Sequence, residues 1–330
     1  TTVMVGGTAP YTLWINNNEQ MQTVNAIQNV VFTGLPAGTH TVTVQDANGC
    51  MATLPLTVTE PNALTMVADN EVAVLCFGDA NGSIRVTPSE GTAPYTVSIN
   101  NFATSQTVHA GGTYTFTGLT AGDYTAMVRD AHNCEFAVDF TIATPDELTL
   151  TEVATTDPLC FQGTDGQIEV ALTGGVEPYN MTVDGAAYGS NLTTGNQTIT
   201  DLAAGAHIIV ITDANGCTTT ITSTLGEPDL LTLTEVATTP ITCHGGADGT
   251  VTVAVAGGTA DYSVWIDASL QTQTLTSVAQ NAVFTDMDGG MHTITVSDGH
   301  HCTAVLQVEF VDPDAMNTIV DSTANVSCFG

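Results

Sequence analysis

Cysteine thiols are the side chains whose spacing in this sequence most clearly indicates chemistry. There are eight, and they form two series that repeat at the same intervals of 84, 83 and 85 residues. The first series is Cys50, Cys134, Cys217 and Cys302, and the second is Cys76, Cys160, Cys243 and Cys328. A regular cysteine framework is typical of disulfide-stabilised proteins in oxidising, extracellular compartments. The alternative is a set of buried free thiols.

The direction of the strands limits which cysteines can meet. If the strands between Cys76 and Cys134 alternate in direction, these two residues lie at opposite ends of one domain. Strands of about eight residues separate those ends by some 25 Å, whereas a disulfide needs Cα atoms within about 7 Å. In a head-to-tail array, the far end of one domain abuts the near end of the next. This favours Cys76 with Cys217 and Cys160 with Cys302, while pairing within a repeat or between chains stays open.

Aspartates in the turns are candidate calcium ligands. One set precedes the hairpin cysteines, at Asp46, Asp130, Asp213 and Asp298, and a second set lies in glycine-rich loops, at Asp79, Asp165 and Asp248. Carboxylates with Asn and backbone carbonyls suit Ca²⁺, yet no twelve-residue calcium loop is present. Aspartate in a turn usually caps its own backbone. We therefore expect no cofactor, with calcium as the open alternative.

One turn position carries a ring in every repeat. After an apolar residue, two further residues, a glycine and one more residue, the chain has Tyr124 in one repeat and His40, His207 or His292 in the others. In immunoglobulin-like sandwiches a tyrosine at such a corner bonds back to the backbone of the turn. We expect these four rings to be structural rather than metal ligands. The histidines of the hairpin turns follow no shared ligand pattern.

Two tryptophans occupy another repeated position. Trp14 and Trp265 each follow the tyrosine that opens a strand by three residues, so strand alternation is expected to point them away from the core. Exposed aromatic rings can stack on sugars or bury a lateral contact. The alternative is a ring half-buried beneath the neighbouring loop. The other two repeats have Ser98 and Thr182 at this position.

Catalytic patterns are missing from the sequence. Ser, His and Asp are plentiful, but no nucleophile lies in a sharp glycine elbow. No pair of carboxylates stands apart from the general acidity. We therefore expect no enzymatic activity.

The elements that must position these residues are short β-strands. Alternating Thr and apolar residues, as in 250–255, recur along the chain between Gly, Pro and Asn, and helix-period segments are absent. The Asp-Ala-Asn-Gly turns before the cysteines are strong hairpin signals. Short strands at regular spacing are typical of β-sandwiches. We predict an all-β fold of tandem immunoglobulin-like (fibronectin- or PKD-like) β-sandwich domains in a linear array.

The recurrence divides the chain into units of about 84 residues. A unit of this size can bury a modest core of its own, and an acidic or Thr residue followed by Pro marks each boundary. We expect repeat 1 at 1–61 without its first strand, repeats 2 to 4 at 62–145, 146–228 and 229–313, and the first strand of the following repeat at 314–330. Because Thr1 aligns with Arg85 and Cys328 with Cys76, we expect the sequence to belong to a longer array.

Charge excludes several classes of partner. The formal net charge is -32, with two arginines as the only strong cations and no lysine. Such a surface repels nucleic acid and anionic membranes, and the absence of lysine rules out isopeptide cross-links. It attracts divalent cations and keeps a long fibre soluble in salt water. No apolar run is long enough to insert into a membrane.

A set of short motifs recurs in each repeat. The second repeat has CFGDANGSI at 76–84, GTAPY at 91–95 and LTAG at 119–122, and DANGC closes the hairpins at 46–50 and 213–217. Together these motifs resemble the SprB-type repeat of gliding-motility adhesins in the Bacteroidetes, over the whole chain. Asp261 in place of proline, and Asn133 or His301 in place of the turn glycine, depart from the pattern only in the turns.

The resemblance implies a structural role. Proteins similar to this are very long, are exported by the type IX secretion system, and act at the cell surface in adhesion and gliding. We expect an exported, extracellular filament region whose partners are copies of itself, with other cells or surface polysaccharide bound through regions outside this sequence. The alternative is a set of carbohydrate-binding modules attached to a secreted enzyme. That reading requires binding residues at equivalent positions in every repeat, which Trp14 and Trp265 do not satisfy.

Overall fold

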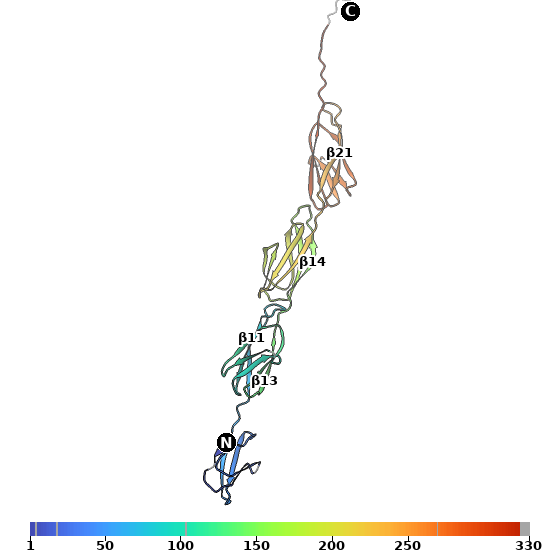
Figure 1. The fold of residues 1–330 in the computed structure, drawn as a ribbon. Helices are drawn as coiled ribbons and strands as arrows, with labels where there is room; N and C mark the ends of the chain where they lie inside the picture. The colour runs from blue at the N-terminus through green and yellow to red at the C-terminus, as the bar shows by residue number, and fades with distance from the viewer. Residues whose placement is uncertain (4, 18, 103, 269, 324–330) are drawn as a thin grey trace, which may run out of the picture. The chain divides into compact units, whose positions relative to one another are not determined.

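The chain folds as antiparallel β-strands joined by turns (Figure 1). The computed structural model describes residues 1–323 except 4, 18, 103 and 269, and this part of the chain contains strands and no helix. Alternation within the strands places one face in a core: in 249–256, Val251, Val253 and Val255 are buried, and the residues between them are half-exposed. The all-β prediction is confirmed.

The second repeat forms a complete two-sheet sandwich. Its strands are β7 (Thr65–Val72), β8 (Gly82–Ser89), β9 (Tyr95–Ile99), β10 (Ser105–Val108), β11 (Tyr114–Leu119), β12 (Gly122–Arg129) and β13 (Glu135–Ile142). One sheet has the order β11-β8-β7 and the other has the order β10-β9-β12-β13. The two sheets share one apolar core.

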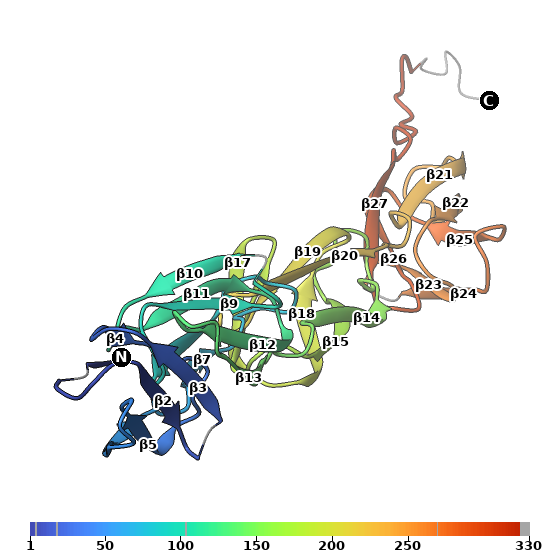
Figure 2. The ribbon, with the colours of Figure 1, turned by 60° about the horizontal axis from the view of Figure 1, so that its bottom comes forward.

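The third and fourth repeats have the same topology. The third has β14 (Thr149–Thr156), β15 (Gly166–Thr173), β16 (Tyr179–Val183), β17 (Ala186–Leu192), β18 (Gly195–Leu202), β19 (Gly205–Thr212) and β20 (Thr218–Leu225). The fourth has β21 (Thr232–Thr239), β22 (Gly249–Ala256), β23 (Tyr262–Ile266), β24 (Gln271–Leu275), β25 (Asn281–Met287), β26 (Gly290–Ser297) and β27 (Thr303–Phe310). Their sheets are β14-β15-β18 with β17-β16-β19-β20, and β21-β22-β25 with β24-β23-β26-β27 (Figure 2).

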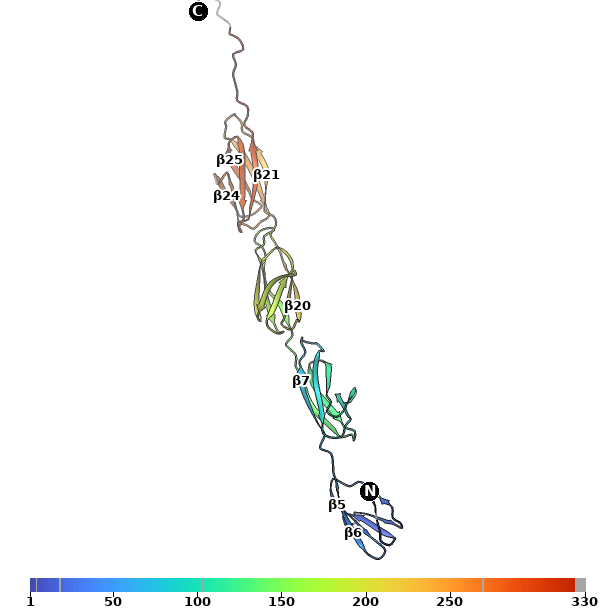
Figure 3. The ribbon, with the colours of Figure 1, turned by 90° about the vertical axis from the view of Figure 1, so that its left-hand side faces the viewer.

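The first repeat has fewer strands. It contains β1 (Thr2–Val3), β2 (Tyr11–Ile15), β3 (Gln20–Val24), β4 (Asn29–Val30), β5 (Gly38–Gln45) and β6 (Met51–Val58). The four-stranded sheet β3-β2-β5-β6 is complete, and the β5–β6 hairpin is visible in Figure 3. The opposite sheet has only the short pair β1-β4. The core of this sandwich is correspondingly small.

In each repeat, the segment that follows the strand opened by the repeated tyrosine contains one short edge strand. These strands, β3, β10, β17 and β24, each pair with the strand that opens at the repeated tyrosine. The peptide bonds before Pro10, Pro94, Pro178 and Asp261 are all cis.

The chain separates into two compact units. One comprises Thr1–Val74 with Gly78–Ala143, and the other comprises Leu75–Phe77 with Thr144–Gly330. The tripeptide around Cys76 therefore belongs with the third sandwich, although its neighbours in sequence belong with the second. Residues 311–323, which include the described part of the segment expected to be a strand, are not paired in any described sheet, and their apolar side chains are exposed.

Candidate functional site at the linked hairpins

Two disulfides join glycine-rich loops to hairpins. Cys76 is bonded to Cys217, and Cys160 is bonded to Cys302, each with a Cα–Cα distance of 5.7 Å. These are the two pairs that the direction of the strands favoured. In both, the loop cysteine of one repeat is bonded to the hairpin cysteine of the next repeat along the chain.

The polar contacts around the two disulfides are alike. The side-chain amide of Asn215 donates to the Leu75 carbonyl at 2.8 Å, and the Nδ1 atom of His300 lies 3.3 Å from the Leu159 carbonyl. The same two carbonyls lie 3.5 Å from the sulfur of the hairpin cysteine. The hairpin therefore holds the loop by a covalent bond and by a polar side chain two residues before its cysteine. His300 thus helps to hold the loop, a role that its sequence position did not predict.

Three other cysteines are free and exposed: Cys50, Cys134 and Cys243. Cys243 belongs to the loop series, and the other two belong to the hairpin series. Cys328 lies outside the described residues.

An aspartate shapes each hairpin, and it is buried in the second, third and fourth sandwiches and half-buried in the first. In the fourth sandwich, one carboxylate oxygen of Asp298 accepts the backbone N–H groups of His300 and Cys302, and the other accepts that of Thr259. Asp46, Asp130 and Asp213 each accept three backbone N–H groups at the equivalent positions. These carboxylates therefore fix the turn and orient the cysteine that follows.

Hydrogen bonds from the backbone also set the charge of two of these carboxylates. The N–H groups of Cys50 and Thr8 lower the pKa of Asp46. Burial raises the pKa of Asp130, but the N–H groups of Cys134 and Thr92 outweigh that effect and lower it. Both aspartates are therefore charged at neutral pH.

The loop aspartates make local bonds. Asp165 accepts the Leu159 N–H, Asp248 accepts the N–H and hydroxyl of Thr242, and Asp79 accepts the Asn81 side-chain amide. The bonds from Thr242 lower the pKa of Asp248. Among the described residues, no group of three or more His, Cys, Asp or Glu side chains is arranged to hold a metal.

The four corner rings all bond back to the turn. The Nε2 atoms of His40, His207 and His292 donate to the carbonyl four residues earlier, at 2.8, 2.9 and 3.0 Å, and the Tyr124 hydroxyl donates to the Thr120 carbonyl. The three histidines are buried. Their position explains why a ring recurs here.

The Nδ1 atom of the corner histidine has different partners in different repeats. Nδ1 of His207 donates to Asp184, and Nδ1 of His292 faces Asp267, whereas Nδ1 of His40 accepts from the Asn16 amide. Burial lowers the pKa of His207, but its bonds to the Ala203 carbonyl and to Asp184 outweigh burial and raise it. Burial likewise lowers the pKa of His292, and Asp267 more than compensates. In the third and fourth sandwiches a carboxylate thus faces Nδ1 and favours the protonated ring.

Comparison with known families identifies the repeats. The family described as SprB repeat matches residues 71–104, 153–187 and 236–268. Each match covers the end of the first strand, the loop cysteine, the second strand and the strand that opens at the repeated tyrosine. The chain is a SprB-type repeat protein. Comparison with curated protein sequences gave no match.

Solved structures similar to this SprB-type repeat protein are themselves tandem β-domains. Sidekick-1 immunoglobulin domains 1–5 are 12% identical, with 92% of this chain and 74% of that chain covered and a TM-score of 0.32. The Clostridium thermocellum CbhA fibronectin(III)-like modules are 17% identical, with 49% of this chain and 95% of that chain covered and a TM-score of 0.24. Protocadherin Gamma B2 cadherin domains 1–5 are 14% identical, with 96% of this chain and 74% of that chain covered and a TM-score of 0.27. These similarities concern β-domain architecture, which the sheets establish directly.

Trp14 of the first repeat and Trp265 of the fourth lie on the outer face of their sheets and are half-buried. The equivalent Ser98 is buried and accepts the Phe102 N–H, and the Phe102 ring lies 4.5 Å beneath the Arg129 guanidinium. This outer-face position thus carries a half-buried tryptophan in two repeats and a buried serine in a third. No common aromatic surface results.

Sequence reasoning missed one repeated anchor of the SprB-type repeat. The hydroxyl groups of the strand-opening tyrosines donate to the backbone of the preceding glycine-rich turn: Tyr11 to Gly7, Tyr95 to Glu90, Tyr179 to Gly174 and Tyr262 to Gly257. The recurrence of tyrosine after this turn was the available signal. The described residues include no helix that is long and apolar enough to cross a membrane.

Proposed function

We propose that this chain is a structural region of a very long extracellular adhesin fibre, exported by type IX secretion and displayed at the cell surface. It serves surface attachment, gliding or the gripping of other cells, and it does mechanical rather than catalytic work. The four repeats at 1–61, 62–145, 146–228 and 229–313 act as its domains. Its partners are copies of itself, and targets are bound through regions outside this sequence.

The bond between consecutive repeats is the observation that carries the proposal. Cys160 and Cys302 close a loop of sequence separation 142, and Cys76 and Cys217 close an overlapping one of 141. A disulfide that only stabilised one domain would be expected to pair cysteines of that domain. Here each bond starts in one repeat and ends in the next, so a pulling force on the ends of the chain passes through it.

Single-molecule stretching of the 330-residue chain tests the mechanical role. Because the two loops overlap, the shortest covalent path between the chain ends crosses from Cys76 to Cys217, runs back to Cys160 and crosses to Cys302. The fully stretched oxidised chain should therefore be roughly half as long as the reduced chain at about 3.5 Å per residue. The Cys160→Ser/Cys302→Ser variant should gain part of that length without reductant. Equal lengths for oxidised and reduced chains would contradict the proposal.

Surface labelling tests the location. Antibodies raised against this chain should label intact cells that produce the parent protein, and external protease should remove the label. A signal obtained only after the cells are permeabilised would contradict an extracellular role.

A further inference from the structure

Side chains close one sheet edge of the fourth sandwich. At the outer edge of β25, the side-chain amide of Gln273 accepts the Val283 N–H at 3.1 Å and donates to the carbonyl of the same residue. The amide of Gln271 accepts the Thr285 N–H at 3.3 Å and donates to the Thr285 carbonyl at 2.6 Å. Both glutamines come from β24, the edge strand of the opposite sheet. Backbone groups that could pair with another strand are therefore already bonded.

The third sandwich closes the same edge with a tyrosine. The hydroxyl of Tyr188, on β17, accepts the Thr200 N–H at 2.8 Å and lies 3.5 Å from the Thr198 carbonyl. These two threonines stand on β18 at the positions that are bonded in β25. A different side chain thus covers the same two backbone positions.

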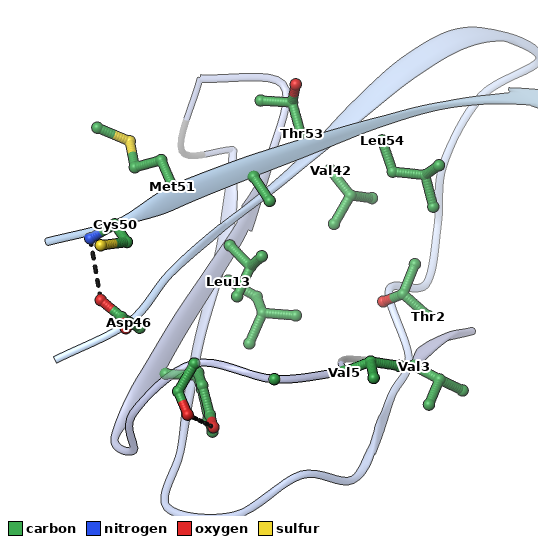
Figure 4. Close-up of a pocket in the computed structure, with 15 residues that line it drawn as sticks. Thr2, Val3, Val5, Leu13, Val42, Asp46, Cys50, Met51, Thr53 and Leu54 are labelled. Carbon is green, nitrogen blue, oxygen red and sulfur yellow. Dashed lines mark hydrogen bonds between the residues drawn. The ribbon is translucent and has the colours of Figure 1, made fainter. Parts of the chain in front are cut away.

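The first sandwich again uses two glutamines of its edge strand, β3. Gln20 donates to the Thr33 carbonyl at 2.6 Å, and Gln22 donates to the Val31 carbonyl at 2.8 Å. The core of this sandwich is open around a cavity of about 400 Å³ beside Leu13 (Figure 4). Burial at its edge is therefore not comparable with burial in the three complete sandwiches.

The equivalent edge of the second sandwich, β11, has no such cover. Thr115 and Thr117 of β11 stand at the two positions that are bonded in β25. Their outward N–H and carbonyl groups have no hydrogen-bond partner among the described residues, and β11 is the last strand of its sheet. Gln106 of β10 stands at the position of Gln273, but its exposed side chain makes no hydrogen bond within the described part of the chain. The edge of β11 is therefore open to another strand.

The apolar side chains of β11 are also less buried than their counterparts. Phe116 is half-buried, whereas the equivalent Phe284 is fully buried. Leu119 is half-buried as well, whereas the equivalent Met287 and Leu202 are at most 7% exposed. The open backbone edge thus coincides with an incompletely covered part of the core.

An aspartate ends this edge in the third and fourth sandwiches but not in the second. The next-to-last residue of the strand has a positive φ in all three, and it is Asp201 in β18, Asp286 in β25 and Gly118 in β11. A charge at a strand edge opposes pairing with a further strand. The second sandwich lacks this protection.

The surroundings of β11 carry little negative charge. No Asp or Glu occurs in residues 91–122, which include β10 and β11 and form the longest such interval in the sequence. On the neighbouring strand β8, Arg85 lies opposite Thr115 and is paired with Asp69. The equivalent residue beside β18 is Glu169. In a chain with a net charge of -32, this edge is an exception.

We propose that the β11 edges of two copies of this chain pair antiparallel about a two-fold axis, so that their three-stranded sheets join into one. With Phe116 of both copies at the axis, Thr115 lies opposite Thr117 of the second copy, and the two residues exchange backbone hydrogen bonds in both directions. This inference rests on the proposed function in taking copies of the chain as partners, and it adds the surface through which they meet.

Charge and symmetry favour a second copy as the occupant of this edge. Because each copy has a formal net charge of -32, contact between copies is least unfavourable where neither surface carries carboxylates. Two-fold pairing meets this condition by placing β11 against β11. It also covers the half-buried Phe116 ring of each copy and gives a closed, self-complementary interface.

Sedimentation of the 330-residue chain over a range of concentrations, with its free thiols alkylated, tests the pairing. The parent chain should dimerise reversibly. Gly118→Asp introduces the residue found in the third and fourth sandwiches, and a Cβ there meets only the Ala80 carbonyl, at 3.9 Å. The carboxylate would lie against the incoming strand, so dimerisation should weaken at least roughly tenfold. Gly118→Asn tolerates the same backbone conformation without the charge and should dimerise like the parent.

A second variant removes backbone donors instead of adding charge. Thr117→Pro deletes an N–H that points away from β8, so it leaves the pairing of β11 with β8 intact, and proline is tolerated at such edge positions. Half of the proposed hydrogen bonds between the copies are lost, and dimerisation should weaken roughly tenfold or more. Circular dichroism should be unchanged in this variant and in both Gly118 variants.

Hydrogen exchange of single amides provides the second readout. The Thr115 and Thr117 amides should exchange rapidly in dilute solution and gain protection as the concentration rises. The Val283 and Thr285 amides, which are bonded to glutamines of their own sandwich, should keep the same protection throughout. They are a control within the same chain.

Several results would overturn the proposal. These are a monomer at every concentration, a dimer that survives both Gly118→Asp and Thr117→Pro, and protection that appears in β10 instead of β11. Protection of Thr115 and Thr117 that is independent of concentration would show that the chain closes its own edge. Binding of a synthetic 113–119 peptide by a chain that never dimerises would exclude a second copy as the occupant. The stretching experiment depends only on disulfides within one chain, so the mechanical proposal is tested separately.

Discussion

At the scale of single residues, the corner histidine shows how one turn position is filled in chemically different ways. All four rings satisfy the backbone carbonyl four residues earlier, which is a structural task. The other ring nitrogen of the histidine, Nδ1, contacts an amide in the first sandwich and a carboxylate in the third and fourth. Only the carboxylate partner favours the charged ring.

The first prediction concerns His207 and pH. Because Asp184 and the Ala203 carbonyl raise the pKa of His207, its stabilising contribution is fully present below about pH 6.5 and is lost as pH rises through the raised value. The His207 bond lowers the pKa of Asp184, so that contribution is lost as pH falls below about 4. The corner should therefore be most stable between these limits. Hydrogen exchange of the β19 amides at several pH values measures this.

Asp184→Asn is the matched variant, since it reproduces the amide partner that His40 has in the first sandwich. The pKa of His207, followed by NMR, should fall in this variant, and the loss of protection between pH 6 and 8 should become smaller. An unchanged His207 titration would show that the carboxylate does not control the ring.

The second prediction concerns the hairpin aspartates. Asp130→Ala removes one buried carboxylate that accepts three backbone N–H groups of the hairpin turn and its neighbour, so it should destabilise the second sandwich by about 3 kcal/mol. Asp139→Ala removes one exposed carboxylate bonded to a threonine hydroxyl and should cost about 0.5 kcal/mol. Urea denaturation followed by hydrogen exchange compares the two variants. Equal effects would mean that the turn does not depend on Asp130.

At the scale of the elements, strand direction decides the disulfide pattern. The loop before β15 and the hairpin after β19 lie at opposite ends of the third sandwich, because β15, β16 and β19 run in alternating directions with the edge strands between them. A loop cysteine therefore meets the hairpin of the following repeat and not its own. The glycine-rich loop is held from outside its own sandwich.

The third prediction follows from this arrangement. Cys302→Ala should release the loop at 159–163, so that its amides exchange about tenfold faster while those of β15 keep their protection. Cys134→Ala removes a thiol that is already free and should change neither. Hydrogen exchange with mass spectrometry resolves both segments. A loop that stays protected without the disulfide would mean that the contacts of Cys160 and Leu159 with the hairpin are sufficient without it.

At the scale of the whole molecule, net charge opposes assembly. Each chain has a formal net charge of -32 and two arginines. Any two copies therefore repel each other at low ionic strength. Both arginines are paired with carboxylates of their own sandwich, Arg85 with Asp69 and Arg129 with Glu135. Any attraction between copies must therefore come from groups other than these two guanidinium ions.

The fourth prediction concerns salt. Raising the ionic strength from about 0.01 to 0.15 M shortens the Debye length from about 30 to 8 Å, so self-association of the chain should become stronger. Magnesium chloride should exceed sodium chloride at equal ionic strength if divalent cations bridge the acidic surfaces. Sedimentation under these conditions measures the effect. Association that is indifferent to salt would contradict the electrostatic argument.

The sequence by itself determined the repeat length, the all-β class and the corner rings, and it favoured the two disulfide pairs over the alternatives. Recurrence, alternation and strand direction are local or periodic properties. Only the tertiary structure showed the tyrosine anchors, the buried serine at the outer-face position, and the carboxylate that raises the pKa of His207 and is absent beside His40. These features depend on which side chains contact one another across the sheets, and the spacing of residues along the sequence does not determine those contacts.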